Sequence, residues 1–229
     1  MTIAVRWQAV QARVAAACER AGRPLGDVTV IAVSKTHPAD AIREALAAGA
    51  TDFGENYAQE LATKFTELGA AAPPHAIRWH FIGRLQRNKA KLVAGRVALV
   101  HAVDTVELAE ELGKRAGGVV QPILLAVNLA GEDTKGGVTA ESAPALARAL
   151  AAVGGCSLAG LMTMPPPSDD AWAGQPYFEG LRALRDRLRD DLGRPLPVLS
   201  MGMSHDFEVA IACGATHIRV GTAIFGHRG

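Results

Sequence analysis

The sequence contains few of the residues that would mark a secreted, metal-binding or nucleic-acid-binding protein. Its three cysteines, Cys18, Cys156 and Cys213, are odd in number and widely spaced. They predict neither a disulfide framework nor a metal site, and they favour a reducing, cytoplasmic setting. Aromatic residues make up only 5% of the chain, which argues against a stacking surface for nucleic-acid bases. The 24 basic and 23 acidic residues nearly cancel, so no general attraction to nucleic acid or to an anionic membrane is expected.

Long hydrophobic runs are also missing. No apolar stretch approaches the roughly 18–20 residues that a membrane span needs. Near the N-terminus, Arg6, Gln8, Gln11 and Arg13 interrupt the apolar residues, so we expect no signal peptide. Because the charge is balanced and no long apolar surface run is present, we expect a monomer.

What is present is a regular alternation of apolar and amphipathic segments. With 229 residues and 49% hydrophobic content, the chain can form one large core, and we expect a single domain over residues 1–229. Residues 3–21 predict an opening helix. Eight apolar runs follow, over residues 28–34, 50–56, 77–83, 97–104, 122–130, 157–164, 197–204 and 217–226. Helical patterns separate them, over residues 38–49, 58–69, 86–95, 105–117, 141–154, 175–193 and 205–214.

This alternation predicts the fold class. The runs are continuously apolar, which favours a parallel sheet covered by helices. Eight units favour a closed (β/α)8 TIM barrel with an extra N-terminal helix over an open doubly wound sheet. No GxGxxG pattern follows the first run, which weakens the Rossmann-like alternative. Many helical patterns end at glycine, the usual left-handed stop: Gly49, Gly69, Gly95, Gly154, Gly193 and Gly214. Residues 163–176, rich in proline and polar residues, predict a mobile loop after a strand.

Lys35 is the first candidate for chemistry. It follows the first apolar run, at the C-terminal strand end where barrels of this kind carry their active groups. A free lysine has a pKa of about 10.4 and is a poor nucleophile at neutral pH. Partial burial disfavours the charged form and frees the lone pair for imine formation with an aldehyde. The alternative is a lysine that simply extends into solvent.

An anion site is predicted after the last two runs. In "SMGMSHDF", Ser204 or Asp206 is placed to cap the next helix, and the backbone N–H groups around Gly202 would face an anion. Gly221 and Thr222 stand at the end of the eighth run. The loops after strands seven and eight are the recurrent phosphate site of these barrels. A plain turn with a capped helix is the alternative.

Arg219 lies inside the apolar run "HIRVG" and is placed to point into the barrel. A buried guanidinium stays charged and donates hydrogen bonds. Opposite a pyridine nitrogen it would keep that nitrogen unprotonated and weaken the ring as an electron sink. The alternative is a structural arginine held in a salt bridge.

Taken together, the motifs resemble the pyridoxal phosphate homeostasis protein family, which looks like the barrel domain of alanine racemase standing alone. The resemblance runs in order from about residue 28 to residue 228. It is carried by "AVSKTHP", "FGENYAQE", "WHFIGRLQRNKAK", "AVDT", "GLMTM", "LSMGMSHDFEVAI" and "IRVGTAIFG".

The resemblance implies a cofactor, pyridoxal 5′-phosphate (PLP), and the residues that bind it. Lys35 would hold PLP as a Schiff base, and Arg219 would face the pyridine nitrogen. Asn56 would lie near the ring and His80 would line the same mouth. From the residues alone, the alternatives are a turn asparagine at Asn56 and a core histidine bonded to backbone at His80.

The phosphate would be bound by residues from the two late segments. The resemblance matches Ser200, Ser204, Gly221 and Thr222 to the phosphate binders, with Met201 in the same loop.

Two positions leave questions about additional lysines. His37 stands where many relatives carry a lysine or another polar residue, which puts a secondary lysine site in doubt. Lys135 in "GEDTKGG" matches a family lysine in a flexible loop, where a lysine is usually just solvated.

The function implied is PLP homeostasis, by buffering the cofactor or transferring it to PLP-dependent client enzymes, without catalysis. The alternative is an amino-acid racemase-like enzyme. Racemisation needs a second acid/base group, which in alanine racemase is a tyrosine from a separate domain of the partner subunit. Because the barrel is expected to take up residues 1–229, we expect no such domain, and the two tyrosines are Tyr57 and Tyr177. A barrel that binds another phosphorylated metabolite non-covalently is a third possibility.

Overall fold

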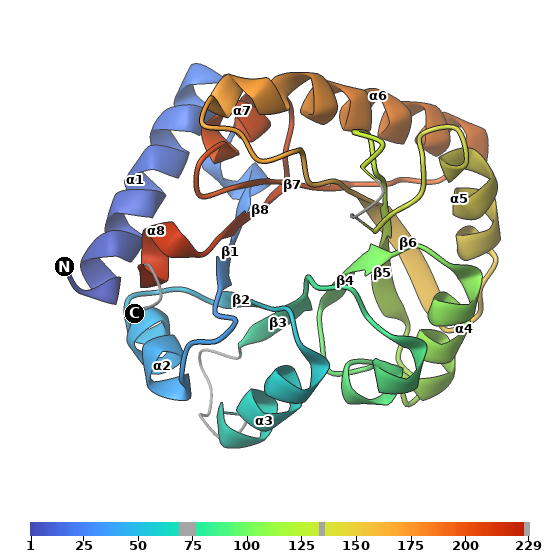
Figure 1. The fold of residues 1–229 in the computed structure, drawn as a ribbon, viewed down its shortest axis with the longest axis horizontal. Coiled ribbons are helices and arrows are strands. Elements are labelled where there is room, and N and C mark those ends of the chain that lie inside the picture. Colours follow the sequence, from blue (N-terminus) through green and yellow to red (C-terminus); the bar gives the residue numbers. More distant parts are fainter. Residues whose placement is uncertain (69–76, 133–135, 227–229) are drawn as a thin grey trace.

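Eight parallel strands form a closed barrel in the computed structural model, which describes residues 1–68, 77–132 and 136–226 (Figure 1). Each strand pairs with its neighbours in chain order, and β8 pairs with β1 to close the ring. The predicted TIM barrel is therefore confirmed. The strands are β1 (Thr29–Val33), β2 (Asp52–Glu55), β3 (Arg78–Phe81), β4 (Leu99–Val103), β5 (Gln121–Ala126), β6 (Cys156–Met162), β7 (Val198–Met203) and β8 (His217–Val220).

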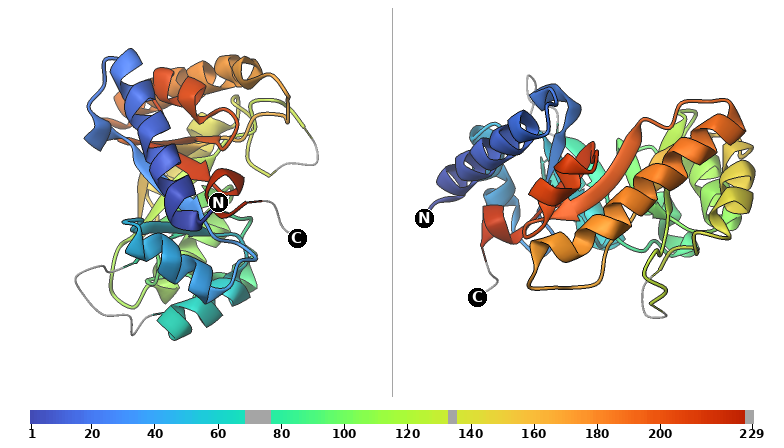
Figure 2. Two further views of the ribbon diagram at one scale, coloured as in Figure 1. Left: turned by 90° about the vertical axis from the view of Figure 1, so that its left-hand side faces the viewer. Right: turned by 90° about the horizontal axis from the view of Figure 1, so that it is seen from above.

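Helices surround the barrel (Figure 2). The α-helices are α1 (Ile3–Arg20), α2 (Ala39–Ala47), α3 (Ala58–Leu68), α4 (Val106–Arg115), α5 (Ala143–Ala151), α6 (Gln175–Leu192), α7 (Phe207–Ala212) and α8 (Thr222–Phe225). Three 3-10 helices are η1 (Leu25–Asp27), η2 (Arg87–Leu92) and η3 (Ala171–Gly174). The predicted N-terminal helix is confirmed as α1, which buries Trp7, Val10 and Val14 against α2, α7 and α8. Among the described residues, no helix is long and apolar enough to cross a membrane.

Two elements differ in detail from the sequence patterns. The helical pattern over residues 86–95 is found as the 3-10 helix η2 (Arg87–Leu92), in which hydrogen bonds such as Val93 N–H to Ala90 O join residues three apart. The eighth run ends as a strand at Val220, and the residues after Gly221 turn into α8. Residues 163–176 do connect β6 to α6, and they contain η3. Gly69 and Lys135 lie outside the described residues.

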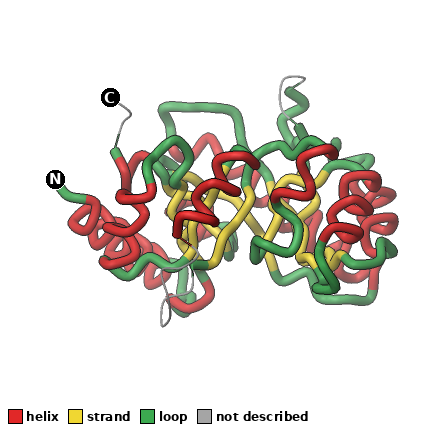
Figure 3. The backbone as a smooth tube through the Cα atoms, turned by 90° about the horizontal axis from the view of Figure 1, so that it is seen from below, coloured by secondary structure: helices red, strands yellow, loops and turns green. Residues whose placement is uncertain are grey.

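Three histidines from three strands lie close together. Figure 3 shows the strands at the centre of the molecule. His80 on β3 and His101 on β4 have ring centroids 5.3 Å apart, and the His217 ring on β8 lies 6.0 and 6.3 Å from them. Burial lowers the pKa of His101 well below its ordinary value, and the nearby His80 and Arg219 lower it further. Burial lowers the pKa of His217 to about 4, and the nearby His80 contributes to the shift. His101 and His217 are therefore neutral in the folded protein at pH 7.

The pairing of β6 with β7, which we call the β6–β7 seam, requires a glycine at position 160. Gly160 pairs with Val198 at a shift in the β5–β6 register. A Cβ atom built on Gly160 would lie 1.9 Å from the Val198 carbonyl oxygen, a contact with backbone that no side-chain rotation relieves.

We expect Gly160→Ala to lower the free energy of unfolding by more than about 3 kcal/mol, because β6 and β7 must separate to admit the methyl group. Urea denaturation followed by circular dichroism measures the loss. Gly26→Ala is the matched control, since no atom lies within 4 Å of a Cβ there. Equal stability of the two variants would show that the seam relaxes freely.

We also expect the free energy of unfolding to fall as the pH is lowered from about 6.5 to about 4. His217 stays neutral in the folded state while the unfolded chain takes up a proton in this window. Its contribution is therefore complete above pH 6.5 and is lost as the pH approaches 4. In His217→Gln the decline should be smaller, by at most about 3 kcal/mol at 1.36 kcal/mol per pKa unit. Denaturant titrations across this range test the slope.

His205→Gln, at an exposed histidine, is the control and should follow the parent protein. A decline in His217→Gln as steep as in the parent protein would mean that other groups set the acid sensitivity.

Candidate functional site

Two adjoining cavities open at the C-terminal end of the barrel, with volumes of about 410 and 340 Å³. They share five lining residues: Lys35, Asn56, Ile82, Met164 and Arg219. We call the two cavities together the barrel mouth. It collects a lysine, an arginine and an amide around two apolar side chains, which is the composition of a small-molecule site.

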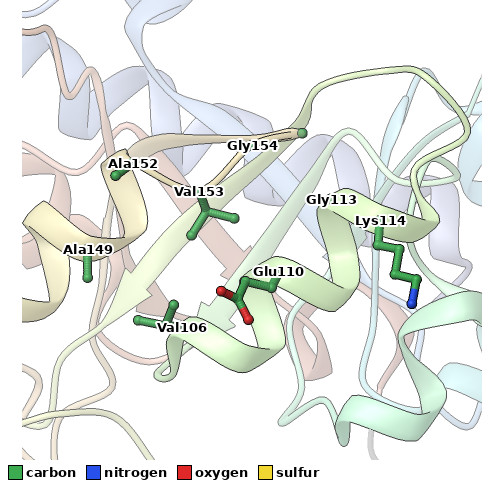
Figure 4. A pocket seen from close by; sticks show the side chains of 9 residues that line it. Val106, Glu110, Gly113, Lys114, Ala149, Ala152, Val153 and Gly154 are labelled. Atoms are coloured by element: carbon green, nitrogen blue, oxygen red, sulfur yellow. The ribbon is translucent and has the colours of Figure 1, made fainter.

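Another cavity lies outside the barrel. It measures about 540 Å³ and is formed between α4 and α5, where mostly small and apolar residues line it (Figure 4). Its charged lining side chains are Glu110 and Lys114. With no convergent set of reactive groups, this cavity is not assigned a function, although it is larger than either part of the barrel mouth.

Lys35 is carried by the turn between β1 and α2. The side chain is half-buried and lines both parts of the barrel mouth. Within the described residues, it makes no hydrogen bond and no ion pair. The next residue, Thr36, has a φ of 65°, in the left-handed region that residues with a branched Cβ rarely adopt. A conformation of this kind persists only where surrounding contacts hold it.

A buried lysine supplies part of that support. Lys64 on α3 donates hydrogen bonds to the Ser34 carbonyl oxygen and to one carboxylate oxygen each of Glu55 and Glu60, all at 2.7 Å. Glu60 accepts the Thr36 N–H at 2.5 Å. The residues on both sides of Lys35 are thus tied to the same ammonium group, directly or through one carboxylate.

Glu55 completes this network from the end of β2. Its Oε1 accepts the Ser34 hydroxyl at 2.6 Å as well as the Lys64 ammonium. Burial raises the pKa of Glu55, and the hydrogen bonds from Lys64 and Ser34 oppose that rise. Its Oε2 is buried and has no hydrogen-bond partner in the described part of the chain. The network therefore depends strongly on the Lys64 charge.

Arg219 enters the barrel mouth from β8. Its guanidinium donates to Ser200 Oγ at 2.6 Å and to the Thr163 carbonyl oxygen at 3.1 Å. Burial lowers the pKa of Arg219 to about 10, so the group remains charged at pH 7. No salt bridge of Arg219 exists among the described residues, so the structural ion pair considered from the sequence is not found there. The side chain is a buried cation that retains donors beyond the two hydrogen bonds made to protein.

One wall of the barrel mouth is built around Ser204. Its Oγ accepts the backbone N–H groups of Gly221 and Ala223 at 3.2 and 3.4 Å. Thr222 also lines this wall. Two backbone N–H groups therefore converge on one hydroxyl oxygen beside β7 and β8. An anion that replaced this oxygen as their acceptor would meet the same two N–H groups and the Ser204 hydroxyl. A Cβ on Gly221 would meet Val33 at an ordinary 3.5 Å, so packing alone does not require glycine there.

Six of the nine residues predicted from the sequence line the barrel mouth: Lys35, Asn56, Ser204, Arg219, Gly221 and Thr222. The other three, His80, Ser200 and Met201, do not line either cavity of the mouth. Whether any of the nine binds a ligand stays a prediction.

The structure corrects the expected positions of these three residues. His80 lines a cavity of about 200 Å³ that also contains the first residues of several strands, at the N-terminal end of the barrel. Ser200 is fully buried inside the barrel, and its Oγ accepts the Arg219 guanidinium. Met201, the next residue, packs into the hydrophobic core. Both lie within β7 itself, because the strand continues to Met203 before the turn begins.

Other lining residues were not predicted. Ile82 and Met164 supply apolar walls, and Met203 and His205 flank Ser204. His37 also lines the mouth and stacks on Phe225, with ring centroids 4.9 Å apart. Ile82, Met164 and His205 follow strands β3, β6 and β7, so their places at the barrel mouth were readable from the sequence, although their side chains were not recognised as part of a site.

Comparison with known proteins places the chain among relatives of similar length. The family described as "Alanine racemase, N-terminal domain" matches residues 5–229. The pyridoxal phosphate homeostasis protein of Aquifex aeolicus is 44% identical over 230 residues, covering 100% of this chain and 99% of the relative. The protein of the same name from Pseudomonas aeruginosa is 44% identical over 229 residues, covering 99% of this chain and 96% of the relative.

Solved structures agree with this placement. PipY of Synechococcus elongatus, solved with PLP bound, has a TM-score of 0.84 and 37% identity, covering 98% of this chain and 100% of PipY. Alanine racemase from Corynebacterium glutamicum has a TM-score of 0.71 at 16% identity, covering 97% of this chain and 62% of the racemase. The second likeness shows a shared barrel fold.

We expect Lys64→Met to lower the free energy of unfolding by about 3–5 kcal/mol, because it leaves two carboxylates near each other without their cation. Chemical denaturation measures the change. The control is Lys91→Met, at an exposed lysine on η2, and it should cost little. Adding Glu55→Gln to Lys64→Met should recover part of the loss. If Lys64→Met is as stable as Lys91→Met, the network does not hold the Lys35 turn.

Proposed function

The chain belongs to the pyridoxal phosphate homeostasis protein family, and from that premise we propose that it binds PLP in the barrel mouth as a Schiff base on Lys35. In this proposal the protein is a carrier. It holds the reactive aldehyde, keeps its free concentration low, and releases it or transfers it to PLP-dependent enzymes. The relatives in this family are named as homeostasis proteins, and the structure of PipY contains PLP.

The single observation that carries the proposal is the pairing of Lys35 with Arg219 in one mouth. Both side chains line both of its cavities. Among the described residues, neither forms an ion pair. An unpaired buried guanidinium suits a ligand that presents a hydrogen-bond acceptor, as a pyridine nitrogen does. An amine without a protein partner is available to an aldehyde.

The remaining walls fit the rest of the cofactor. Ser204, Gly221 and Thr222 would hold the phosphate through hydroxyl and backbone N–H groups. Ile82 and Met164 provide the apolar surface that an aromatic ring needs, and Asn56 adds an amide beside Lys35. PLP bound here would supply a carbonyl carbon that amines attack. The protein would contribute the amine, the cation at the ring nitrogen and the anion-binding wall.

The placement of the tyrosines supports a carrier over an enzyme. Two-sided proton transfer at the cofactor would need a second acid/base group facing Lys35. Neither Tyr57 nor Tyr177 lines the barrel mouth. Tyr57 is 52% exposed and lines a neighbouring groove. A positive Arg219 at the ring nitrogen would also weaken the ring as an electron sink.

A racemase-like enzyme is the second candidate, and the match to the alanine racemase domain favours it. Racemisation of alanine or serine by the purified protein tests it directly. Turnover on the order of 1 per second, within the ordinary enzyme range, would replace the carrier function by an enzymatic one.

We expect borohydride reduction of the PLP-treated protein to label one peptide, the one that contains Lys35. Lys35→Ala should lose the label and the absorption band of the protonated imine, because the site then offers no amine. Lys114→Ala, at an exposed lysine on α4, is the control and should keep both.

Two results would contradict the proposal. A label and band that persist in Lys35→Ala would assign the Schiff base to another lysine. Tight binding of PLP without any borohydride-trapped product would support a non-covalent site for a phosphorylated metabolite.

A further inference from the structure

A chain of hydrogen bonds runs through the barrel interior from Arg219 to the opposite end. Arg219 Nη1 lies 2.6 Å from Ser200 Oγ, which lies 2.8 Å from His101 Nδ1. His101 Nε2 lies 3.0 Å from His80 Nδ1, and His80 Nε2 lies 2.9 Å from Asp52 Oδ1. The five residues come from β8, β7, β4, β3 and β2. We call Asp52, His80, His101, Ser200 and Arg219 the interior relay.

The chemistry of the two ends is consistent with one direction along the interior relay. A guanidinium only donates, so Ser200 Oγ accepts from Arg219 and has its own hydrogen to give to His101 Nδ1. With both histidines neutral, His101 then carries its proton on Nε2 and donates to His80 Nδ1, and His80 donates from Nε2 to the Asp52 carboxylate. Every group is satisfied in this arrangement. A doubly protonated His80 would instead donate from both ring nitrogens and reverse the bonds at His101 and Ser200.

The far end is anchored near the surface. Asp52 Oδ2 accepts from the Arg78 guanidinium at 2.7 Å and from the Thr51 hydroxyl at 2.8 Å. Burial alone would raise the pKa of Asp52, but the hydrogen bonds from His80, Arg78 and Thr51 outweigh it and lower the pKa to about 2. Asp52 is thus an ionised acceptor at pH 7. The Arg78 side chain is 59% exposed, so this end reaches solvent on the side away from the barrel mouth.

We propose that the interior relay acts as one positioning unit, in which hydrogen bonds of one direction hold the Arg219 guanidinium at the barrel mouth. Asp52 at the far end thereby affects how tightly the barrel mouth binds its ligand. Ser200, His101 and His80 are positioning residues, since none of them lines the mouth. The part of this inference that concerns binding rests on the proposed function, because PLP is the ligand used to read it out.

In the part of the chain that the structure describes, the side chains of Ser200 and His101 form hydrogen bonds only within the interior relay. His217 is close to both relay histidines but its Nδ1 contacts the Thr216 hydroxyl at 3.0 Å. The Thr163 carbonyl oxygen accepts from Arg219 Nη2 and fixes only that end. His217 therefore offers a matched control: a histidine of the same interior, outside the chain of hydrogen bonds.

The direction is tested on the protein without PLP, by nitrogen-15 NMR of the histidine rings at neutral pH. His80 and His101 should both be neutral with the proton on Nε2. A His101 proton on Nδ1, or a doubly protonated His80, would reverse the direction at Ser200 and overturn the proposal. This measurement needs no variant and no cofactor, so it stands even if PLP does not bind.

The coupling is tested by the dissociation constant of PLP in four variants. Ser200→Ala should raise it about tenfold, as expected for loss of a hydrogen bond to a charged group. Asp52→Ala should raise it about fivefold, within the range of long-range coupling. Asp52→Asn keeps an oxygen that accepts from His80 and should stay within about twofold. His217→Gln should match the parent protein.

Circular dichroism and melting of each variant show whether it is folded. Parent-like PLP binding in Asp52→Ala would overturn the coupling, and so would a loss in His217→Gln as large as in Asp52→Ala. Failure of the parent protein to bind PLP would remove the proposed function and the coupling to PLP, while the NMR result would still decide whether the interior relay has the inferred direction.

Discussion

The site depends on the hydrogen-bonded closure of β8 onto β1. Ala32 pairs with Val220 in parallel register, so the chain leaves both strands at the same edge of the barrel. Lys35 follows one strand, and Gly221 follows the other, while Arg219 projects from β8 into the same mouth. Residues from the two ends of the chain therefore meet at a distance fixed by backbone pairing. If these residues lay on separate domains joined by a mobile linker, the distance between them would vary.

Two buried polar networks then hold the residues that the barrel closure brings to the mouth. One, centred on Lys64, ties down the turn that carries Lys35. The other, the interior relay, ends on Arg219. Buried charges cost desolvation energy, and apolar replacements are often as stable or more so. Their placement behind the two cationic groups of the mouth suggests that they are kept for geometry. Each fixes a side chain that makes no ion pair in the described structure.

Much of the fold and of the mouth could be predicted from the sequence, because strand ends carry local signals. Continuous apolar runs with glycine stops indicated the barrel, and Lys35 and Ser204 follow their runs closely enough to be assigned to the mouth. The sequence carries no comparable signal for how deep in the barrel a strand residue lies. That depth depends on the stagger between strands, which places His80 and Ser200 below the barrel mouth. Lys64 was also hidden, since a lysine on an amphipathic helix is ordinarily exposed.

The central claim is that one PLP molecule bridges Lys35 and the wall beside β7 and β8. A crystal structure of this protein with PLP tests it most directly. The account predicts continuous electron density from Lys35 Nζ to the cofactor, the phosphate beside Ser204 and the Gly221 N–H, and the ring nitrogen facing Arg219. Phosphate density elsewhere, or a Lys35 amine that is separate from the cofactor, would contradict it.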